Sequence, residues 1–157
     1  MIEITDAKPN DIALIAALLC DEDVKEMSCT RRVGDVVRLV SDTMESEYCK
    51  VVTDAGLPIM AFGAKRFPFD PGFAFVWGFK TDLGWRAGRS VTKHIKRTMI
   101  PALRASGVSR AACLVHRENG TSCRWLSHLG FAPKATPGVG SPHRDLILYF
   151  WDDVDAA

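Results

Sequence analysis

The chain has 157 residues, of which 47% are hydrophobic and 25% are charged, and its formal net charge is +1. This length fits one domain that would bury roughly 70% of the surface exposed by its unfolded chain, and the composition is ordinary for a soluble globular protein. The five cysteines form no CxxC pair, which argues against a disulfide framework or a cysteine-based metal site and for a reducing compartment.

The N-terminal residues MIEITDAKPND contain neither the basic stretch nor the apolar run of a signal peptide. No apolar run in the chain approaches the roughly 18 residues needed to span a membrane. We therefore expect a cytoplasmic protein with no membrane partner.

Charge is unevenly distributed along the chain. Residues 1–60 carry 12 acidic and 6 basic side chains, whereas residues 61–157 carry 7 acidic and 14 basic ones. A basic second half fits an anionic ligand, or only the solvated faces of helices. A nucleic-acid partner bound through the basic segment 86–104 is the least favoured reading, because net charge is near zero and no exposed motif combines aromatic and basic residues.

The first predicted element is a short strand over residues 2–5, which alternate between apolar and polar. A helix should follow from Asp11 to about Cys20. Asp6 or Asn10 is expected to cap it, since short polar acceptors are preferred at helix N-termini. Its apolar residues recur at helical spacing, and they are Ile12, Ile15, Ala16 and Leu19.

The polar segment 21–32 predicts a loop or a short helix, and residues 33–46 predict a second amphipathic helix. Residues 49–67 change to strand character and indicate a hairpin that turns at residues 54–56, where Gly56 can adopt positive φ. The segment 67–72 is rich in turn residues. On the second helix we expect one buried face, made of Val36, Val37, Val40 and Met44.

Residues 72–81 form an aromatic-rich strand that is too apolar on both faces to lie at a wet edge. A long helix should follow, with Pro101 kinking it or marking its last turns. A buried strand over 108–116 and a helix over 119–130 come next. The buried stripe of the long helix keeps a four-residue rhythm, through Val91, Ile95, Met99 and Leu103.

The chain closes with a strand over 144–152, and residues 131–134 add another short strand before a proline- and glycine-rich loop over 133–142. The element order is therefore β-α-α-β-β-β-α-β-α-β. Such a mixture of hairpins and crossovers predicts one three-layer α/β domain over residues 1–157.

Two stretches carry a resemblance to a known family. An apolar strand leads into an Arg/Gly turn and a long helix, and Asn119 is followed by a helix of about ten residues and then by Leu129-Gly130-Phe131. This pattern resembles the GNAT superfamily of acyl-CoA-dependent N-acyltransferases. The resemblance implies an α/β (α+β) three-layer GNAT-like fold, with a central mixed, mostly antiparallel sheet splayed between its fourth and fifth strands and helices on both faces.

The implied activity is transfer of an acetyl group from acetyl-CoA, a thioester cosubstrate, to an amine acceptor. Backbone groups of the splayed strands would pair with the pantetheine, and the turn before the long helix would present N–H groups and the positive helix end to the pyrophosphate. Gly88 would let the backbone approach that phosphate closely. The residues expected to contact the cofactor are Phe79, Lys80, Arg86, Gly88, Arg89, Ser90, Asn119 and Arg124.

The sequence departs from the family pattern at the phosphate turn. The superfamily turn reads Arg/Gln-x-x-Gly-x-Gly/Ala, and aligning Gly88 with its first small residue puts Trp85 on the Arg/Gln position and Ser90 on the last. A shift by one residue puts Ala87 and Arg89 on the two small positions instead. Many relatives also carry a Tyr seven residues after the Asn as general acid, where this chain has Leu126.

The strand over 72–81 contains no carboxylate to act as general base. The candidate bases are Asp23, Glu26, His116 and Glu118, of which we choose His116, Glu26 and Asp23 as the catalytic candidates. The two acids would share a face if the segment 21–32 is helical, and the imidazole pKa suits removal of an ammonium proton near neutral pH.

A narrower resemblance is to short phage-encoded GNAT-like proteins, which share an acidic D-x-x-E after the first helix and the Asn…Arg-Trp-Leu…Leu-Gly-Phe pattern. It implies the host cytoplasm or the virion as location. It also gives an alternative function, a catalytically degenerate protein that acts in virion assembly or host interaction through a protein partner. A homodimer and the identity of the acceptor stay open, and no spacing suggests a metal site.

Overall fold

The computed structural model describes residues 1–30, 35–134 and 145–153. In these residues the sheet runs in the order β1-β2-β3-β4-β5-β7-β6. Its strands are β1 (Ile2–Asp6), β2 (Tyr48–Asp54), β3 (Leu57–Phe67), β4 (Asp70–Lys80), β5 (Arg110–His116), β6 (Ala132–Lys134) and β7 (Leu146–Asp152). The predicted loop over 133–142 lies mostly outside the described residues.

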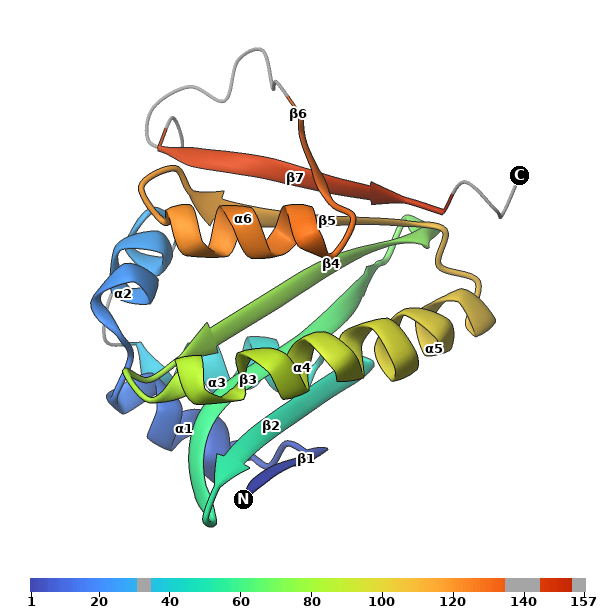
Figure 1. The fold of residues 1–157 in the computed structure, drawn as a ribbon. Coiled ribbons are helices and arrows are strands. Elements are labelled where there is room, and N and C mark those ends of the chain that lie inside the picture. Colours follow the sequence, from blue (N-terminus) through green and yellow to red (C-terminus); the bar gives the residue numbers. More distant parts are fainter. Residues whose placement is uncertain (31–34, 135–144, 154–157) are drawn as a thin grey trace.

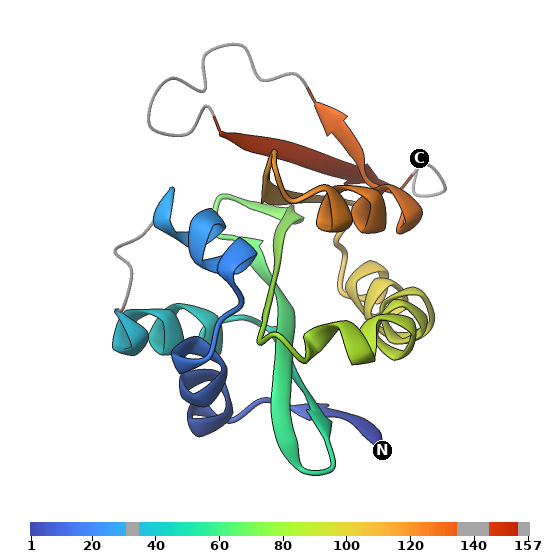
Figure 2. The ribbon, with the colours of Figure 1, turned by 60° about the vertical axis from the view of Figure 1, so that its left-hand side comes forward.

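Helices cover both faces of this sheet, as the two views show (Figures 1 and 2). One face carries α1 (Pro9–Ala17), α2 (Asp21–Ser28) and α3 (Val36–Met44). The other carries α6 (Gly120–His128) and one long helical rod, which consists of a 3₁₀ turn η1 (Gly84–Ala87), α4 (Gly88–His94), a π-helical segment η2 (Ile95–Met99) and α5 (Ile100–Ala105). The predicted three-layer architecture is confirmed.

All strand pairs are antiparallel except β4 and β5, which run parallel. This parallel pair shares only Phe73↔Arg110, Ala74↔Ala111 and Phe75↔Ala112, although β4 continues to Lys80 and β5 to His116. The two strands therefore separate after Phe75 and Ala112, which confirms the predicted splay between the fourth and fifth strands.

The two helical layers enclose two separate apolar clusters. The larger cluster lies on the α4–α6 face and includes Val91, Ile95, Met99, Leu126 and Leu129. The smaller cluster packs α1 and α3 on the opposite face, and its members are Ile12, Ile15, Leu39, Val51, Ala61 and Phe79. Because β4 contributes alternate residues to both clusters, it is a central strand, as its composition predicts.

The start of α1 differs from the prediction. The helix begins two residues earlier, with Pro9 at its first position, and its N-cap is Lys8 rather than Asp6 or Asn10. The carboxylate of Asp11 accepts the Lys8 N–H at 3.0 Å. Proline suits the first helical position because its missing N–H has no partner there in any case.

The predicted face of α3 is also partly wrong. Leu39 and Thr43 are buried, whereas Val37 is 82% exposed. At 100° per residue, Val37 lies about 200° around the helix from Leu39, so it cannot share the buried stripe. The apolar stripe consists of Leu39, Val40 and Met44.

Pro101 is predicted either to kink the long helix or to mark its last turns. Proline cannot donate to the carbonyl four residues earlier, so a regular α-helix would leave Arg97 without its donor. The structure widens into the π-helical segment Ile95–Met99 directly before Pro101 and then continues to Ala105. Proline therefore marks the last turns of the rod.

Candidate active site

Helix α2 places two carboxylates against the ends of the splayed strands. The Asp23 Oδ2 atom accepts the backbone N–H of Lys80, the last residue of β4, at 2.7 Å. The Glu26 Oε1 atom accepts the backbone N–H of His116, the last residue of β5, at 2.8 Å. Residues three apart share a helix face, so one turn of α2 satisfies both strand ends. The predicted pairing of Asp23 with Glu26 on one helix face is therefore present.

The hydrogen bonds of β4 show which backbone groups face the splay. Gly72 and Lys80 both use their carbonyls on the β5 side, where they accept from Ser109 and Cys20. Alternate residues of a strand direct N–H and C=O to the same edge, so Gly78 also faces β5. In the described part of the chain, strand pairing gives Gly78 no partner on this edge.

On β5 the same reasoning identifies Leu114. His116 directs its N–H toward Glu26, and Leu114 lies two residues earlier on the same edge, beyond the last pair at Ala112. Both strands thus present main-chain groups to the space between them. Unpaired main-chain groups are strong donors and acceptors for a bound amide.

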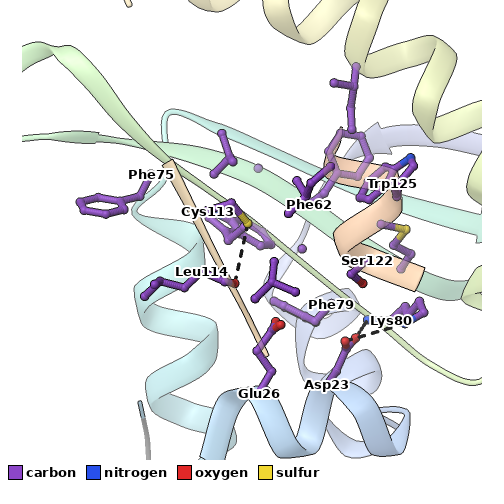
Figure 3. Close-up of a pocket in the computed structure, with 18 of the residues that line it drawn as sticks. Asp23, Glu26, Phe62, Phe75, Phe79, Lys80, Cys113, Leu114, Ser122 and Trp125 are labelled. Carbon is purple, nitrogen blue, oxygen red and sulfur yellow. Dashed lines mark hydrogen bonds and ion pairs between the residues drawn. The ribbon is translucent and has the colours of Figure 1, made fainter. Parts of the chain in front are cut away.

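A cavity of about 790 Å³ passes through this opening in the sheet. Its half on the α1–α3 side is lined by Glu26, Asp23, Phe75, Phe79 and Leu114, among others (Figure 3). Its other half reaches Phe62, Val91, Ser122, Trp125 and Leu126. A single cavity therefore gives two reactants access to one point from opposite faces of the sheet.

Glu26 is the titratable group best suited to accept a proton in this cavity. Burial raises its pKa from 4.5 to about 7; the His116 N–H acts in the opposite direction and Asp23 adds to the rise. Burial also raises the pKa of Asp23, which is only 5% exposed, against the opposing effect of Lys80. The Asp23 carboxylate lies 3.8 Å from the Lys80 ammonium, so it is paired, whereas Glu26 holds only a main-chain N–H.

The ring of His116 does not line the cavity. Its Nδ1 atom accepts the N–H of Glu118 at 3.2 Å, and only its main chain reaches Glu26. Glu118 itself forms a surface ion pair with Lys25 at 3.3 Å. The geometry therefore favours Glu26 over His116 as the group that meets a reactant.

The cysteine at the opening is not a nucleophile. Burial raises the pKa of the Cys113 thiol to about 12, so the thiolate is absent near neutral pH.

Among the described residues, no cluster of His, Cys, Asp and Glu could hold a metal ion. Within the same residues, no helix is long and apolar enough to cross a membrane.

The residues expected at the cofactor divide into two groups. Phe79 and Lys80 line the cavity, and Gly88 and Arg89 line a shallower groove of about 490 Å³ between α4 and α6. This groove is strongly basic, since Lys93, Lys96, Arg97 and His128 complete it, with Trp125 beside them. A groove that is lined by four lysine and arginine side chains and no acidic one fits a phosphate-rich ligand.

The second group points elsewhere. Arg86 forms an ion pair at 3.3 Å with Asp54 on the β2–β3 hairpin. Ser90 and Arg124 are exposed and line neither the cavity nor the groove. Asn119 is the N-cap of α6, where its Oδ1 atom accepts the Ser122 N–H at 3.2 Å. Its Nδ2 atom is buried and has no hydrogen-bond partner in the described residues.

The turn before α4 is a 3₁₀ helix rather than an open glycine loop. The N–H groups of Gly84, Arg86 and Gly88 donate to Thr81, Leu83 and Trp85. Gly88 has a helical φ of −50°, and a Cβ on it would meet no protein atom within 4 Å. Its value as a glycine is therefore the open space above it, not an unusual backbone conformation.

Among the described residues, few hydroxyl groups are placed to act as the general acid that the family resemblance implies. Leu126 is buried in the core, Tyr48 is hydrogen-bonded to His94 at 2.7 Å, and Tyr149 lies outside the cavity. Ser122 lines the cavity on the α6 side (Figure 3), whereas the Ser127 hydroxyl donates to the Cys123 carbonyl.

Sequence reasoning missed part of the α1–α3 half of the cavity. Phe75, Trp77 and Leu114 line it, but they belong to strands that read simply as apolar. Their exposure could not be inferred from composition, because it depends on where α1 and α3 stop covering the sheet. The available signal was the phenylalanine-rich stretch of residues 73–79.

The sequence matches no protein-family model and no curated protein sequence. Its fold, however, matches solved structures along almost the whole chain. An acetyltransferase from Streptococcus agalactiae superposes with a TM-score of 0.72 at 17% identity, covering 96% of this chain and 98% of that one. The GNAT domain of S. lividans PAT gives a TM-score of 0.71 at 14% identity, over 96% of this chain and 89% of that one.

A third similar structure was solved with a cofactor. The yncA protein of Salmonella typhimurium, solved with its cofactor acetyl-CoA, gives a TM-score of 0.69 at 19% identity, over 98% of this chain and 94% of that one. Identities this low establish the architecture alone. The seven-stranded sheet with its parallel β4–β5 pair is thus the GNAT fold.

Proposed function

We propose that this protein transfers an acetyl group from acetyl-CoA to an amine. The observation that carries the proposal is the cavity that passes through the splayed sheet, with free strand edges inside it and Glu26 at one side. The fold of acetyltransferases such as yncA, solved with acetyl-CoA, supports the same conclusion.

The α4–α6 side suits the thioester. Main-chain groups of Gly78 and Leu114 face the opening and are able to pair with the amides of a pantetheine arm. The basic groove that begins at Gly88 and Arg89 suits the phosphates, with Lys93, Lys96 and Arg97 supplying further charge. The Gly78 N–H is the free donor on β4 that could polarise a thioester carbonyl, since Asp23 already occupies the Lys80 N–H.

The α1–α3 side suits the amine. Glu26 in its charged form removes a proton from the ammonium group, and the neutral amine nitrogen then forms a bond to the carbonyl carbon as the carbon–sulfur bond breaks. The acylated nitrogen then loses its second proton, which passes through the Ser122 hydroxyl or water to the departing thiolate, so that an amide and free CoA result. A base with a pKa of about 7 is matched to this task near neutral pH.

The closed 3₁₀ turn and Leu126 favour one alternative, a non-catalytic role in virion assembly or host interaction. The two readings separate in a thermal-shift titration with acetyl-CoA and CoA, followed by a CoA-release assay with an amine panel. Acetyl transfer predicts a raised melting temperature with both ligands and amine-dependent CoA release. An unchanged melting temperature at saturating acetyl-CoA favours the alternative.

A further inference from the structure

The α1–α3 half of the cavity has apolar walls. Six hydrophobic side chains from α2, α3, β4 and β5 line it, and they are Met27, Leu39, Phe75, Trp77, Phe79 and Leu114. Trp77 and Phe79 stack with ring centroids 5.4 Å apart. Phe75 and Leu114 are 41% and 40% exposed, so these walls reach the surface of the protein. Walls of this composition select a ligand with an apolar body.

The apolar lining continues outward through a cluster of phenylalanines. The ring of Phe75 meets those of Phe73 and Phe67 edge to face, with ring centroids 5.0 Å and 6.0 Å apart. Phe67 in turn meets Phe69 with centroids 5.8 Å apart. Rings in such arrangements offer both faces and edges to a further aromatic ring. An aromatic ligand entering beside Phe75 would extend this array.

The charged groups around this half are already paired, with one exception. Asp23 interacts with Lys80, Asp42 lies 3.9 Å from Arg38, and Lys65 lies 2.7 Å from Glu45. Two neutral polar groups are also engaged: Ser46 accepts from the Trp77 indole at 2.9 Å, and Thr43 donates to the Leu39 carbonyl at 2.7 Å. Glu26 is the remaining acid that lines this half of the described structure.

We propose, on the basis of the acetyl-transfer function inferred above, that the acceptor is a small aromatic amine with a single positive charge. Its amino group meets Glu26, and its ring lies against Phe75, Leu114 and Trp77. A polyamine, an amino sugar or free lysine is a poor acceptor, because a second charged or strongly hydrated group would lose its water against apolar walls without gaining a partner.

The test compares acceptors in a CoA-release assay. We expect 2-phenylethylamine and tryptamine to give kcat/KM values at least tenfold above those of spermidine, glucosamine and free lysine. Phe75→Ala should raise the KM for 2-phenylethylamine about tenfold and lower the ratio of its kcat/KM to that of spermidine. Leu57→Ala is the control, because Leu57 is 44% exposed at the start of β3 and does not line the cavity.

A gain-of-function variant tests the charge argument separately. Leu114→Glu adds a second carboxylate at the exposed end of the same wall, and it should shift the preference toward spermidine. Circular dichroism melts of all variants report whether they fold. The shift of preference toward spermidine is a gain of activity with that amine. A variant that is merely damaged therefore cannot produce it.

The outcomes distinguish the two proposals. CoA release with spermidine or glucosamine but not with 2-phenylethylamine overturns the acceptor assignment and leaves acetyl transfer standing. Unchanged acceptor preference in both Phe75→Ala and Leu114→Glu also overturns it. Failure of acetyl-CoA to bind, with no CoA release for any amine, overturns acetyl transfer and the acceptor assignment together.

Discussion

Glu26→Gln separates the cost of burying a charge from its use in catalysis. The amide keeps an oxygen that can accept the His116 N–H, which the carboxylate accepts at 2.8 Å, but it no longer titrates. In the wild-type protein, burial raises the Glu26 pKa from 4.5 to about 7. At 1.36 kcal/mol per unit, the charged form is disfavoured in the fold by at most about 3 kcal/mol.

The sign of the pH effect follows from this direction. The folded protein holds the Glu26 proton more tightly than the unfolded chain, so the contribution of Glu26 to stability is fully present below pH 4.5 and is lost as pH rises through about 7. Glu26→Gln should therefore match the wild-type free energy of unfolding near pH 4.5 and exceed it by up to about 3 kcal/mol at pH 8. Urea denaturation at both pH values measures the difference.

The activity of Glu26→Gln should fall at pH 8, although its stability rises there. Loss of the base is expected to lower kcat/KM by about 10²–10⁴-fold at pH 8, and wild-type kcat/KM should fall about tenfold per pH unit below 7. Glu118→Gln is the matched control, since Glu118 is an exposed acid paired with Lys25 outside the cavity. A Glu26→Gln variant that is no more stable than wild type at pH 8, or that keeps the wild-type rate there, refutes this reasoning.

Three further experiments test other parts of the site. Arg89→Glu should weaken acetyl-CoA binding about tenfold by calorimetry, because Arg89 lines the basic groove. Arg86→Glu should keep the Kd for acetyl-CoA within about twofold of the wild-type value, because Arg86 pairs with Asp54 instead. Gly88→Ala should stabilise the fold by about 0.4–1 kcal/mol in urea melts, since its φ of −50° suits alanine and a Cβ meets no protein atom, yet it should weaken acetyl-CoA binding. Asp23→Ala should destabilise the protein by about 1–3 kcal/mol in the same melts, because the half-buried Lys80 N–H loses its acceptor. Asp23→Asn should recover most of that loss.

Each of these has a contradicting result. Equal acetyl-CoA affinities for the Arg89 and Arg86 variants would exclude the groove as the phosphate site. Unchanged affinity in Gly88→Ala would show that no ligand approaches the rod there. An Asp23→Ala variant as stable as wild type would show that α2 does not anchor the end of β4.

Local patterns were enough to predict most of the fold. The helical spacing of Ile12 and Ile15 and the turn at residues 54–56 both depend on neighbours along the chain, and both appear in the structure. Gly130 has the positive φ of +95° expected of the residue that ends α6. Errors arose where several local solutions compete, as at the α1 N-cap, where Asp11 serves from inside the helix instead of Asp6 or Asn10 serving as the cap.

The candidate site was less predictable because it joins distant segments. The sequence indicated that Asp23 and Glu26 share a helix face, but not that they receive N–H groups from Lys80 and His116. Those contacts depend on the relative position of α2 and two strand ends, which no local pattern encodes. The direction of Arg86 was hidden for the same reason, since its partner lies on the β2–β3 hairpin.

The central claim is that acetyl-CoA binds within the opening between β4 and β5. Calorimetric titration of acetyl-CoA into wild-type protein and Gly78→Leu tests it most directly. A Cβ on Gly78 would meet only ordinary contacts at 3.5–3.8 Å, so the leucine should be tolerated while its side chain fills the cavity beside the free strand edge. We predict one site per chain with a Kd of about 100 µM or tighter in the wild type, and at least a tenfold weaker one in Gly78→Leu. No binding heat in the wild type, or equal affinity in a folded Gly78→Leu variant, would contradict the claim.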